Sequence, residues 1–284
     1  MWLSAAASKG QCTGFEGSEP GGSKNPEYLS TLERGLRVLK AFDEDHPEMT
    51  LSEVAARTGL PPAVARRCLI TLVDLGYIGQ HERRFLLRPA VLTIGSAFLA
   101  SMQIEQVVLP PLQHLRDQTG DSASLAVLSG SDILYVAHVS TDRRFRVAAG
   151  VGTRFPFHAT SMGKAMAAHL PAAEREALLS RAPFPRFTER TVTEPAAMAE
   201  RLALVAERGY DSALDELDYG IVSVAVPIFG RAGAVIAAIN CSTSTTRISQ
   251  DELVRTRLPL LRAAAGEIEA ALKRWPALEA SLRP

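Results

Sequence analysis

Arg66 and Arg67 stand out as residues that could do chemistry, because an arginine fork can bind guanine edges and phosphates. They belong to a stretch whose pattern predicts two short helices joined by a tight turn. Thr50 and Glu53 form a capping box that starts the first helix, and Gly59 is placed to end it in a left-handed cap. Both arginines then fall in the second helix.

The second helix is predicted to begin at the proline pair 61–62, where missing N–H groups do no harm. At 100° per residue, one narrow arc is apolar and would pack on a core, with Val64, Cys68, Leu72 and Leu75. The opposite face would meet the DNA major groove and carries Ala63, Arg66, Arg67 and Ile70. An ordinary helical hairpin with two solvated arginines is the alternative.

A β-hairpin is predicted directly after these helices. The apolar pairs Tyr77-Ile78 and Phe85-Leu86 bracket a polar turn at 79–84. Arg83 and Arg84 near its tip would lie along phosphates, which completes a winged helix-turn-helix. Residues 50–88 hold six arginines against three acidic residues, a local charge of about +3 that gives mild support.

The totals place the chain among ordinary globular proteins. Its 284 residues suggest two domains, and its formal net charge of +0 does not by itself indicate a nucleic-acid partner. No run is long enough to span a membrane, and no signal peptide is visible at the N-terminus. The three cysteines, 12, 68 and 241, are odd in number and far apart, so we expect a reduced, cytoplasmic protein without disulfides. No metal-ligand spacing is present, and neither a metal nor a membrane is expected as a partner.

Four segments are expected along the chain: a disordered tail at 1–26, the DNA-binding domain at 27–88, a linker helix at 89–103, and a larger domain at 104–276. A helix starting at Ser30 would pack under the helix-turn-helix through an apolar face made of Leu32, Leu36, Val38, Leu39 and Phe42. The prolines at 110 and 111 should start a new helix or kink the existing one.

The larger domain mixes strands and helices, which predicts an α+β fold with a largely antiparallel sheet. The strands 221–229 and 234–240 are apolar nearly throughout, so both of their faces should be covered. The remaining expected elements are strands at 124–128, 133–139 and 145–148, a loop at 150–157, and helices at 161–170, 172–180, 195–208 and 249–274.

No catalytic motif is present. The chain lacks a nucleotide-binding loop, a Gly-x-Ser-x-Gly elbow and a His-Glu-x-x-His zinc motif. Ser161 and Cys241 have no local base motif, so a structural role is favoured for both. Two alternatives stay open: an enzyme that converts a small acid in a cleft of the larger domain, with the N-terminal domain as an interaction module, and an architectural DNA-binding protein with a degenerate pocket.

Motifs spread over most of the chain resemble the IclR-type bacterial transcriptional regulators. In the first domain the resemblance is carried by residues 32–39 and 50–56, and in the second by Gly152–Lys164, Leu217–Ile228 and the strand end Asn240–Ser242. Residues 65–72 and 159–163 look most like the subgroup that controls aromatic-acid catabolism through the β-ketoadipate pathway. Regulators of that subgroup respond to acids such as protocatechuate, 4-hydroxybenzoate or β-ketoadipate.

The resemblance implies a winged helix, a linker helix and a GAF-like effector-binding domain, with no enzymatic activity and no cofactor. It also implies homodimers, or dimers of dimers, on pseudo-palindromic operators, where protein symmetry matches DNA symmetry.

The effector site is likewise carried over from the resemblance. A small carboxylic acid would be bound by Thr160, Ser161, Met162, Ser223, Asn240 and Ser242. Backbone N–H groups at a helix start suit a carboxylate, and hydroxyl and amide groups can orient an acid in an apolar cleft. Arg143, Arg144 and Arg154 are further candidates, which would pair with a second carboxylate. Some relatives have Cys in place of Ser223 or an acidic residue in place of Ala213, so this pocket differs from that of a small 2-oxo-acid binder.

Overall fold

The structure is a computed structural model that describes residues 25–141 and 149–283. The chain divides into two compact units between Leu99 and Ala100, here called the N-terminal unit and the C-terminal unit, and each is described by itself. Across the described residues, no helix is both long enough and apolar enough to cross a membrane. The predicted tail and the predicted strand at 145–148 fall almost wholly outside the described ranges.

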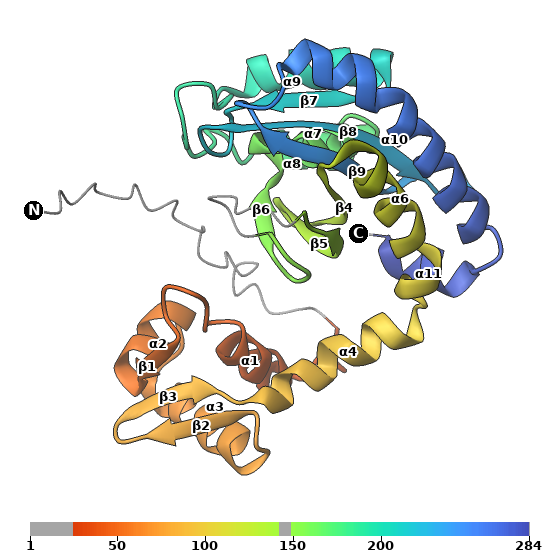
Figure 1. Cartoon of the computed structure of the whole chain (residues 1–284). Coiled ribbons are helices and arrows are strands. Elements are labelled where there is room, and N and C mark those ends of the chain that lie inside the picture. Colours follow the sequence, from red (N-terminus) through yellow and green to blue (C-terminus); the bar gives the residue numbers. More distant parts are fainter. Residues whose placement is uncertain (1–24, 142–148, 284) are drawn as a thin grey trace, which may run out of the picture. The chain divides into compact units, whose positions relative to one another are not determined.

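The N-terminal unit consists of three helices and a small antiparallel sheet (Figure 1). The helices are α1 (Ser30–Leu39), α2 (Leu51–Thr58) and α3 (Pro62–Asp74). The strands β1 (Glu48–Thr50), β2 (Ile78–His81) and β3 (Arg84–Leu87) pair in the order β1-β3-β2. This is a winged helix-turn-helix, as predicted, with the unpredicted short strand β1 added to the edge of the wing.

Local signals set the helix ends in this unit. The capping box of Thr50 and Glu53 is present, and Gly59 ends α2 at φ 65° in the left-handed region. The predicted apolar face of α1 is only partly correct. Val38 and Phe42 are buried, whereas Leu32 and Leu36 are 61% and 43% exposed. The leucine spacing predicts the helix, but it does not predict whether the side chains of the first two turns are covered within this unit.

A short 3-10 turn (Pro89–Val91) leads into α4 (Leu92–Ser101), which crosses the boundary between the two units. The sequence predicted a linker helix at 89–103, and that role stays a prediction. The next helices are α5 (Ile104–Val107) and α6 (Leu109–Thr119). The new helix therefore starts at the proline pair 110–111, as expected from the missing N–H groups.

The C-terminal unit is built on a six-stranded, wholly antiparallel sheet in the order β6-β5-β4-β9-β8-β7. The strands are β4 (Ser122–Ser129), β5 (Asp132–Val139), β6 (Arg154–Pro156), β7 (Asp211–Leu214), β8 (Ile221–Phe229) and β9 (Val235–Ser244). Pro227 is tolerated in β8 because the pairing with β7 spans only Val222 to Ala225, so β8 has no neighbour on that side at the proline.

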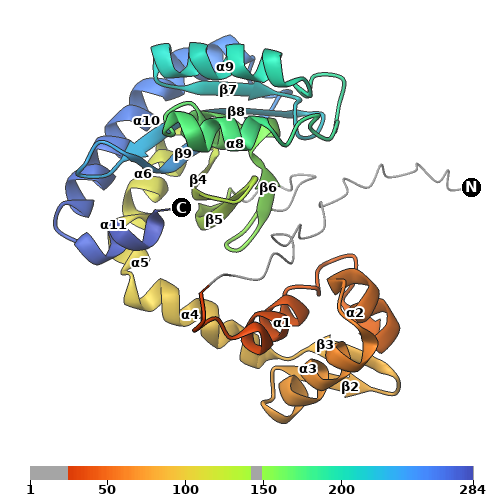
Figure 2. The same cartoon turned by 180° about the vertical axis from the view of Figure 1, so that it is seen from behind.

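Helices cover both faces of this curled sheet (Figure 1, Figure 2). One face carries α7 (Ser161–Ala167), with α8 (Ala172–Leu179) and α9 (Pro195–Arg208) beside it. The other carries α6 and the long α10 (Gln250–Leu272), which is followed by α11 (Pro276–Leu282). The prediction that both faces of the 221–229 strand are covered is confirmed, since β8 is buried at every residue except its two ends.

Three expectations for this unit need correction. Residues 150–157 are not simply a loop, because β6 pairs with β5 there, from Leu134 to Asp132. β7 and α11 were missed: β7 has four residues and α11 seven, too few for a periodic pattern to be recognised. The final long helix ends at Leu272 rather than about Arg274.

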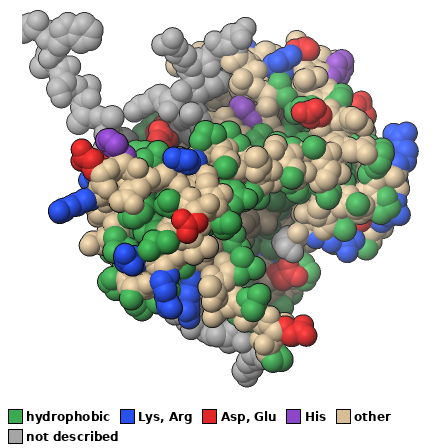
Figure 3. Space-filling model, turned by 90° about the horizontal axis from the view of Figure 1, so that it is seen from below, with side chains coloured by type: hydrophobic (Ala, Val, Ile, Leu, Met, Phe, Trp, Pro, Cys, Tyr) green, Lys and Arg blue, Asp and Glu red, His purple; other side chains and the backbone are tan. Residues whose placement is uncertain are grey.

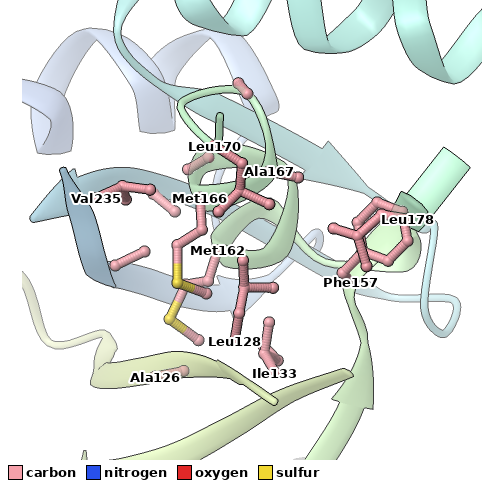
Figure 4. Packing of buried hydrophobic residues seen from close by; sticks show 14 of the residues in the cluster. Ala126, Leu128, Ile133, Phe157, Met162, Met166, Ala167, Leu170, Leu178 and Val235 are labelled. Atoms are coloured by element: carbon pink, nitrogen blue, oxygen red, sulfur yellow. The ribbon is translucent and has the colours of Figure 1, made fainter. Parts of the chain in front are cut away.

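The core beneath α7 is formed by methionines that meet apolar strand residues. Met162 and Met166 point from α7 toward the strands that carry Ala126, Leu128 and Ile133 (Figure 4). Gly163 lies between them, and a Cβ there would sit 2.3 Å from the backbone oxygen of Phe157. Only glycine therefore allows α7 to lie this close to the turn formed by Phe157–Ala159, and that approach sets the position of Ser161 and Met162.

Candidate functional site

The outward face of α3 is as predicted. Ala63, Arg66, Arg67 and Ile70 are all exposed. Neither guanidinium group forms an ion pair or hydrogen bond with any described residue. The inward face is shifted from the predicted arc, because Ala65 and Leu69 are fully buried beside Cys68 and Leu72, while Val64 is half-buried and Leu75 is 62% exposed.

The two wing arginines differ from one another. Arg83 is exposed in the turn between β2 and β3. Arg84 instead donates a hydrogen bond of 3.1 Å to the backbone oxygen of Glu48, and lies 3.5 Å from the Glu48 carboxylate and 3.7 Å from that of Glu53. The wing therefore offers one uncommitted arginine, and the second ties the wing to the start of α2.

Cationic side chains form no continuous patch on the face drawn in Figure 3, where Lys and Arg stand in small separate groups among hydrophobic and uncharged residues. This agrees with a formal net charge of +0. We therefore expect the salt dependence of DNA binding to be moderate.

The C-terminal unit contains a cavity of about 460 Å³ between the concave face of the sheet and α7. All six residues predicted from the family resemblance line it: Thr160, Ser161, Met162, Ser223, Asn240 and Ser242. Its size is in the range of pockets that hold small organic ligands. The sequence also missed part of the lining, namely Ser122, Ser124, Tyr135, His138, Ser140 and Glu216.

Cross-strand pairing arranges the polar lining in two rows. In the first, the hydroxyl row, Ser223, Ser242 and Ser122 are direct neighbours across β8, β9 and β4. Ser161 joins it from α7, with 2.8 Å between its Oγ and that of Ser223. Because side chains alternate along a strand, residues two positions away share this face and form the second row.

The second row, the amide–imidazole row, runs from Asn240 to Ser124 to His138 across β9, β4 and β5. The Ser124 Oγ lies 2.9 Å from Nδ1 of His138. Burial lowers the pKa of His138 below its ordinary value. In the protein without a ligand, this histidine is therefore predominantly neutral at pH 7.

A β-bulge in β5 brings Tyr135 and His138 to the same cavity. Leu125 pairs with Ala137, but the next residue, Ala126, pairs with Tyr135, so β5 carries one extra residue. The bulge allows Tyr135 and His138, three positions apart, to line the same cavity, with 6.2 Å between their ring centroids. Strict alternation would have placed them on opposite faces.

Three polar atoms of the lining have no partner among the described residues. One is Thr141 Oγ1, and the other two belong to more deeply buried side chains. These two are Ser122 Oγ and Asn240 Oδ1, on side chains that are 5% and 4% exposed. Buried polar atoms are nearly always hydrogen-bonded, and an unpaired one is costly. Both residues line the cavity, so a ligand with suitable groups would satisfy them.

A buried ion-pair network lies behind the cavity wall. Lys164 is 0% exposed and pairs with the carboxylate of Glu216, while Asp211 lies 3.5 Å away. Asp211 also accepts from Arg201 at 2.8 Å and from Arg208 at 3.1 Å. The network joins α7 and β7, which both contribute residues to the cavity, to α9.

Of the predicted arginine candidates, the structure describes only Arg154. Arg143 and Arg144 lie outside the described residues. Arg154 does not line the cavity, because it hydrogen-bonds Asp132 at 3.2 Å and the Ser129 hydroxyl at 3.0 Å. No group of residues that could hold a metal ion occurs in the described part of the chain.

Neither nucleophile considered from the sequence is hydrogen-bonded to a base among the described residues. The hydroxyl of Ser161 meets another serine hydroxyl, and burial raises the pKa of Cys241 to about 12. Cys241 also does not line the cavity, because it alternates with Asn240 and Ser242 along β9.

Known proteins resemble the chain along most of its length. It is 37% identical over 245 residues to the Pca regulon regulatory protein of Pseudomonas putida, covering 86% of this chain and 84% of the relative. It is 32% identical over 250 residues to the p-hydroxybenzoate hydroxylase transcriptional activator of Acinetobacter baylyi, covering 86% and 92%.

Solved structures of regulators are also similar to this chain. A transcriptional regulator from Rhodococcus sp. RHA1 is 39% identical with a TM-score of 0.73, covering 87% of this chain and 99% of that one. An IclR homolog from Microbacterium hydrocarbonoxydans, solved in complex with 4-hydroxybenzoate, is 29% identical with a TM-score of 0.72, covering 86% and 99%.

Family profiles match both units: the IclR helix-turn-helix domain at residues 31–82, and the bacterial transcriptional regulator IclR C-terminal domain at 96–270. The matched proteins are regulators, which answers the alternative of an acid-converting enzyme. The chain belongs to the IclR family of DNA-binding bacterial transcriptional regulators.

Proposed function

We propose that this regulator senses a small aromatic acid and controls genes of aromatic-acid catabolism, of the β-ketoadipate type. The observation that carries the proposal is the cavity, which is lined by six sequence-predicted residues and by three polar atoms that have no partner among the described residues. The names of the relatives give the chemical class, because they include Pca and p-hydroxybenzoate regulators. A further neighbour, a double mutant of the PobR inducer-binding domain from Acinetobacter, was solved in complex with 3-hydroxybenzoic acid.

On DNA, Arg66 and Arg67 would read base edges beside Ala63 and Ile70, and Arg83 would contact phosphate. We propose a homodimer, or a pair of dimers, on a pseudo-palindromic operator in the cytoplasm, with α4 as part of the linker. This assembly is supported by the family's helix-turn-helix domain, which usually reads paired half-sites.

An effector would act by binding two arrangements of the protein unequally, because a ligand with equal affinity for both shifts nothing. The test is calorimetric titration of the full chain with 4-hydroxybenzoate, 3-hydroxybenzoate, protocatechuate and β-ketoadipate. We expect at least one acid to bind with a stoichiometry of one per chain and to raise the thermal midpoint of unfolding.

The matched variants are Ala213→Leu and Ala203→Leu. Ala213 lines the cavity, whereas Ala203 is exposed on α9. The first variant should fill the cavity and lose binding, and the second should bind like the wild type. Binding that survives Ala213→Leu unchanged would place the effector elsewhere.

A further inference from the structure

The ionisable side chains of the cavity lining differ in sign from one end of the cavity to the other. Among the described residues of its lining, Glu216 carries a negative charge and His138 is the only side chain that can become a cation. Glu216 follows β7, and His138 lies on β5, four strands away in the sheet order. Among these residues, an anionic group in the cavity can gain a cationic partner only at His138 on β5, because Glu216 is itself an anion and the Lys164 beside it is already paired.

The unpaired Asn240 Oδ1 indicates where the other end of the ligand would bind. Asn240 Oδ1 is an acceptor without a donor. A carboxylate has no proton to give it, whereas a ring hydroxyl has one. Asn240 and His138 lie at the two ends of the amide–imidazole row, two inter-strand spacings or about 10 Å apart. A ring that carries a carboxylate and a hydroxyl at opposite positions spans such a gap with a hydrogen bond at each end.

We propose that His138, held by Ser124, is the specificity-determining residue that binds the effector carboxylate, and that effector binding takes up one proton from solvent at its imidazole. The ring hydroxyl then donates to Asn240 Oδ1. This inference rests on the proposed function, since it assumes that an aromatic acid occupies the cavity. It adds the orientation of that acid and a coupling of its binding to pH.

The proton uptake is argued from the contacts of the His138 ring. We assign to the free protein the tautomer in which Nδ1–H of His138 donates to the Ser124 hydroxyl, 2.9 Å away. Nε2 then carries no proton before binding, and it gains one to donate to a carboxylate oxygen. Burial lowers the pKa of His138 in the protein without ligand, and a carboxylate in contact raises it. Between these two pKa values the complex holds one more proton than the free protein, so affinity falls as pH rises through the pKa in the complex.

The other titratable groups of the lining are not expected to take up this proton. Tyr135, on the same strand, has its pKa raised by burial and stays neutral. Glu216 is paired with Lys164, which also faces Asp211. On β4 and β9 the neighbours of His138 in its row are Ser124 and Asn240, and neither titrates.

The test uses the full chain and 4-hydroxybenzoate in calorimetric titrations at pH 7.5 in two buffers, phosphate and Tris, whose ionisation enthalpies differ. The difference in observed enthalpy gives the number of protons taken up. We expect a clear uptake, toward one proton per site, in the wild type and none in His138→Gln. The affinity of this variant should fall about tenfold or more, because a charge-assisted hydrogen bond is lost.

His114→Gln is the matched control, because His114 is exposed on α6 and outside the cavity. It should take up the same proton as the wild type. Ser124→Ala should weaken binding by a few-fold while keeping the uptake. The neutral analogue 4-hydroxybenzamide should bind the wild type much more weakly than the acid does, and His138→Gln should lose this preference.

Three results would overturn the inference. Binding of 4-hydroxybenzoate to the wild type without proton uptake would remove His138 as the carboxylate partner and leave the proposed function intact. Equal binding of the acid and its amide by the wild type would do the same. Failure of every aromatic acid to bind the wild type would overturn the inference and the proposed function together. The first two results need no variant, so the test stands even if His138→Gln folds poorly.

Discussion

The two units use charged side chains in opposite ways. In the N-terminal unit, Arg66 and Arg67 are exposed on α3 and have no charged partner among the described residues. In the C-terminal unit, Lys164 is 0% exposed and is held between Glu216 and Asp211. An uncommitted cation in water is available for an external anion, whereas a buried paired cation holds elements together. Basic residues therefore indicate a binding surface only once their partners are known.

The largest expected effect is the loss of the buried cation. Lys164→Met would leave the carboxylates of Glu216 and Asp211 with less compensation, and breaking a buried pair in this way costs about 3–5 kcal/mol. Hydrogen exchange on the full chain should show destabilisation confined to the C-terminal unit. Lys273→Met, at an exposed lysine after α10, should change little. A stable C-terminal unit in Lys164→Met would contradict the structural role given to this network.

The next effect concerns the exposed arginines. Arg67→Ala should weaken specific operator binding by roughly 1–3 kcal/mol, the value of a good arginine–guanine contact, and weaken non-specific DNA binding much less. Effector affinity and the thermal midpoint should not change. Arg274→Ala, at an exposed arginine of the C-terminal unit, is the control. An equal loss of specific and non-specific binding would make Arg67 a phosphate contact instead.

A third prediction concerns acid sensitivity in the C-terminal unit. Burial, with the nearby charge of Lys164, lowers the pKa of His158 to about 4, although its ring nitrogen Nε2 donates to the Pro185 carbonyl at 2.9 Å. Below about pH 6.5 the unfolded chain binds a proton that the folded chain does not. The free energy of unfolding should therefore fall as pH drops from 6.5 toward 4, by about 2 kcal/mol at pH 5.

Urea titrations at pH 5 and pH 7 measure this loss for the wild type, His158→Gln and the control His114→Gln. The His158 variant should show the smaller loss of stability, provided that it still folds at pH 7. An equal pH dependence in all three proteins would remove His158 as the cause.

The smallest effect separates the two wing arginines. Arg83→Ala should lower the slope of log affinity against log salt by about 1, because one phosphate contact is lost. Arg84→Ala should change that slope less, since its guanidinium is held by Glu48 and Glu53. DNA binding measured from 50 to 200 mM salt compares them. The reverse order would mean that Arg84 leaves its partners when DNA binds.

Local signals in the sequence predicted much of this fold. The capping box at Thr50, the left-handed cap at Gly59 and the whole of α9 follow from residues close to one another in the chain. The cavity-lining positions 160–162, 223, 240 and 242 were found through the family resemblance, because no local pattern brings such distant residues together.

The features that the sequence missed depend on tertiary pairing. The bulge that turns Tyr135 and His138 to the same side arises from the register between β4 and β5. The ion pairs of Arg84 require β3 to lie beside β1. Leu32 and Leu36 have helical spacing, but their exposure depends on what packs against α1. Periodicity predicts which elements form, and it does not predict which neighbours they meet.

We propose that ligand binding in the cavity controls DNA binding by α3, and measuring this coupling in both directions tests it most directly. The operator affinity of the full chain is determined with and without saturating 4-hydroxybenzoate, and the affinity for 4-hydroxybenzoate with and without operator. We expect operator and 4-hydroxybenzoate each to change the affinity for the other by the same factor, of about fivefold or more. Operator affinity that stays the same while 4-hydroxybenzoate fills the cavity would contradict it.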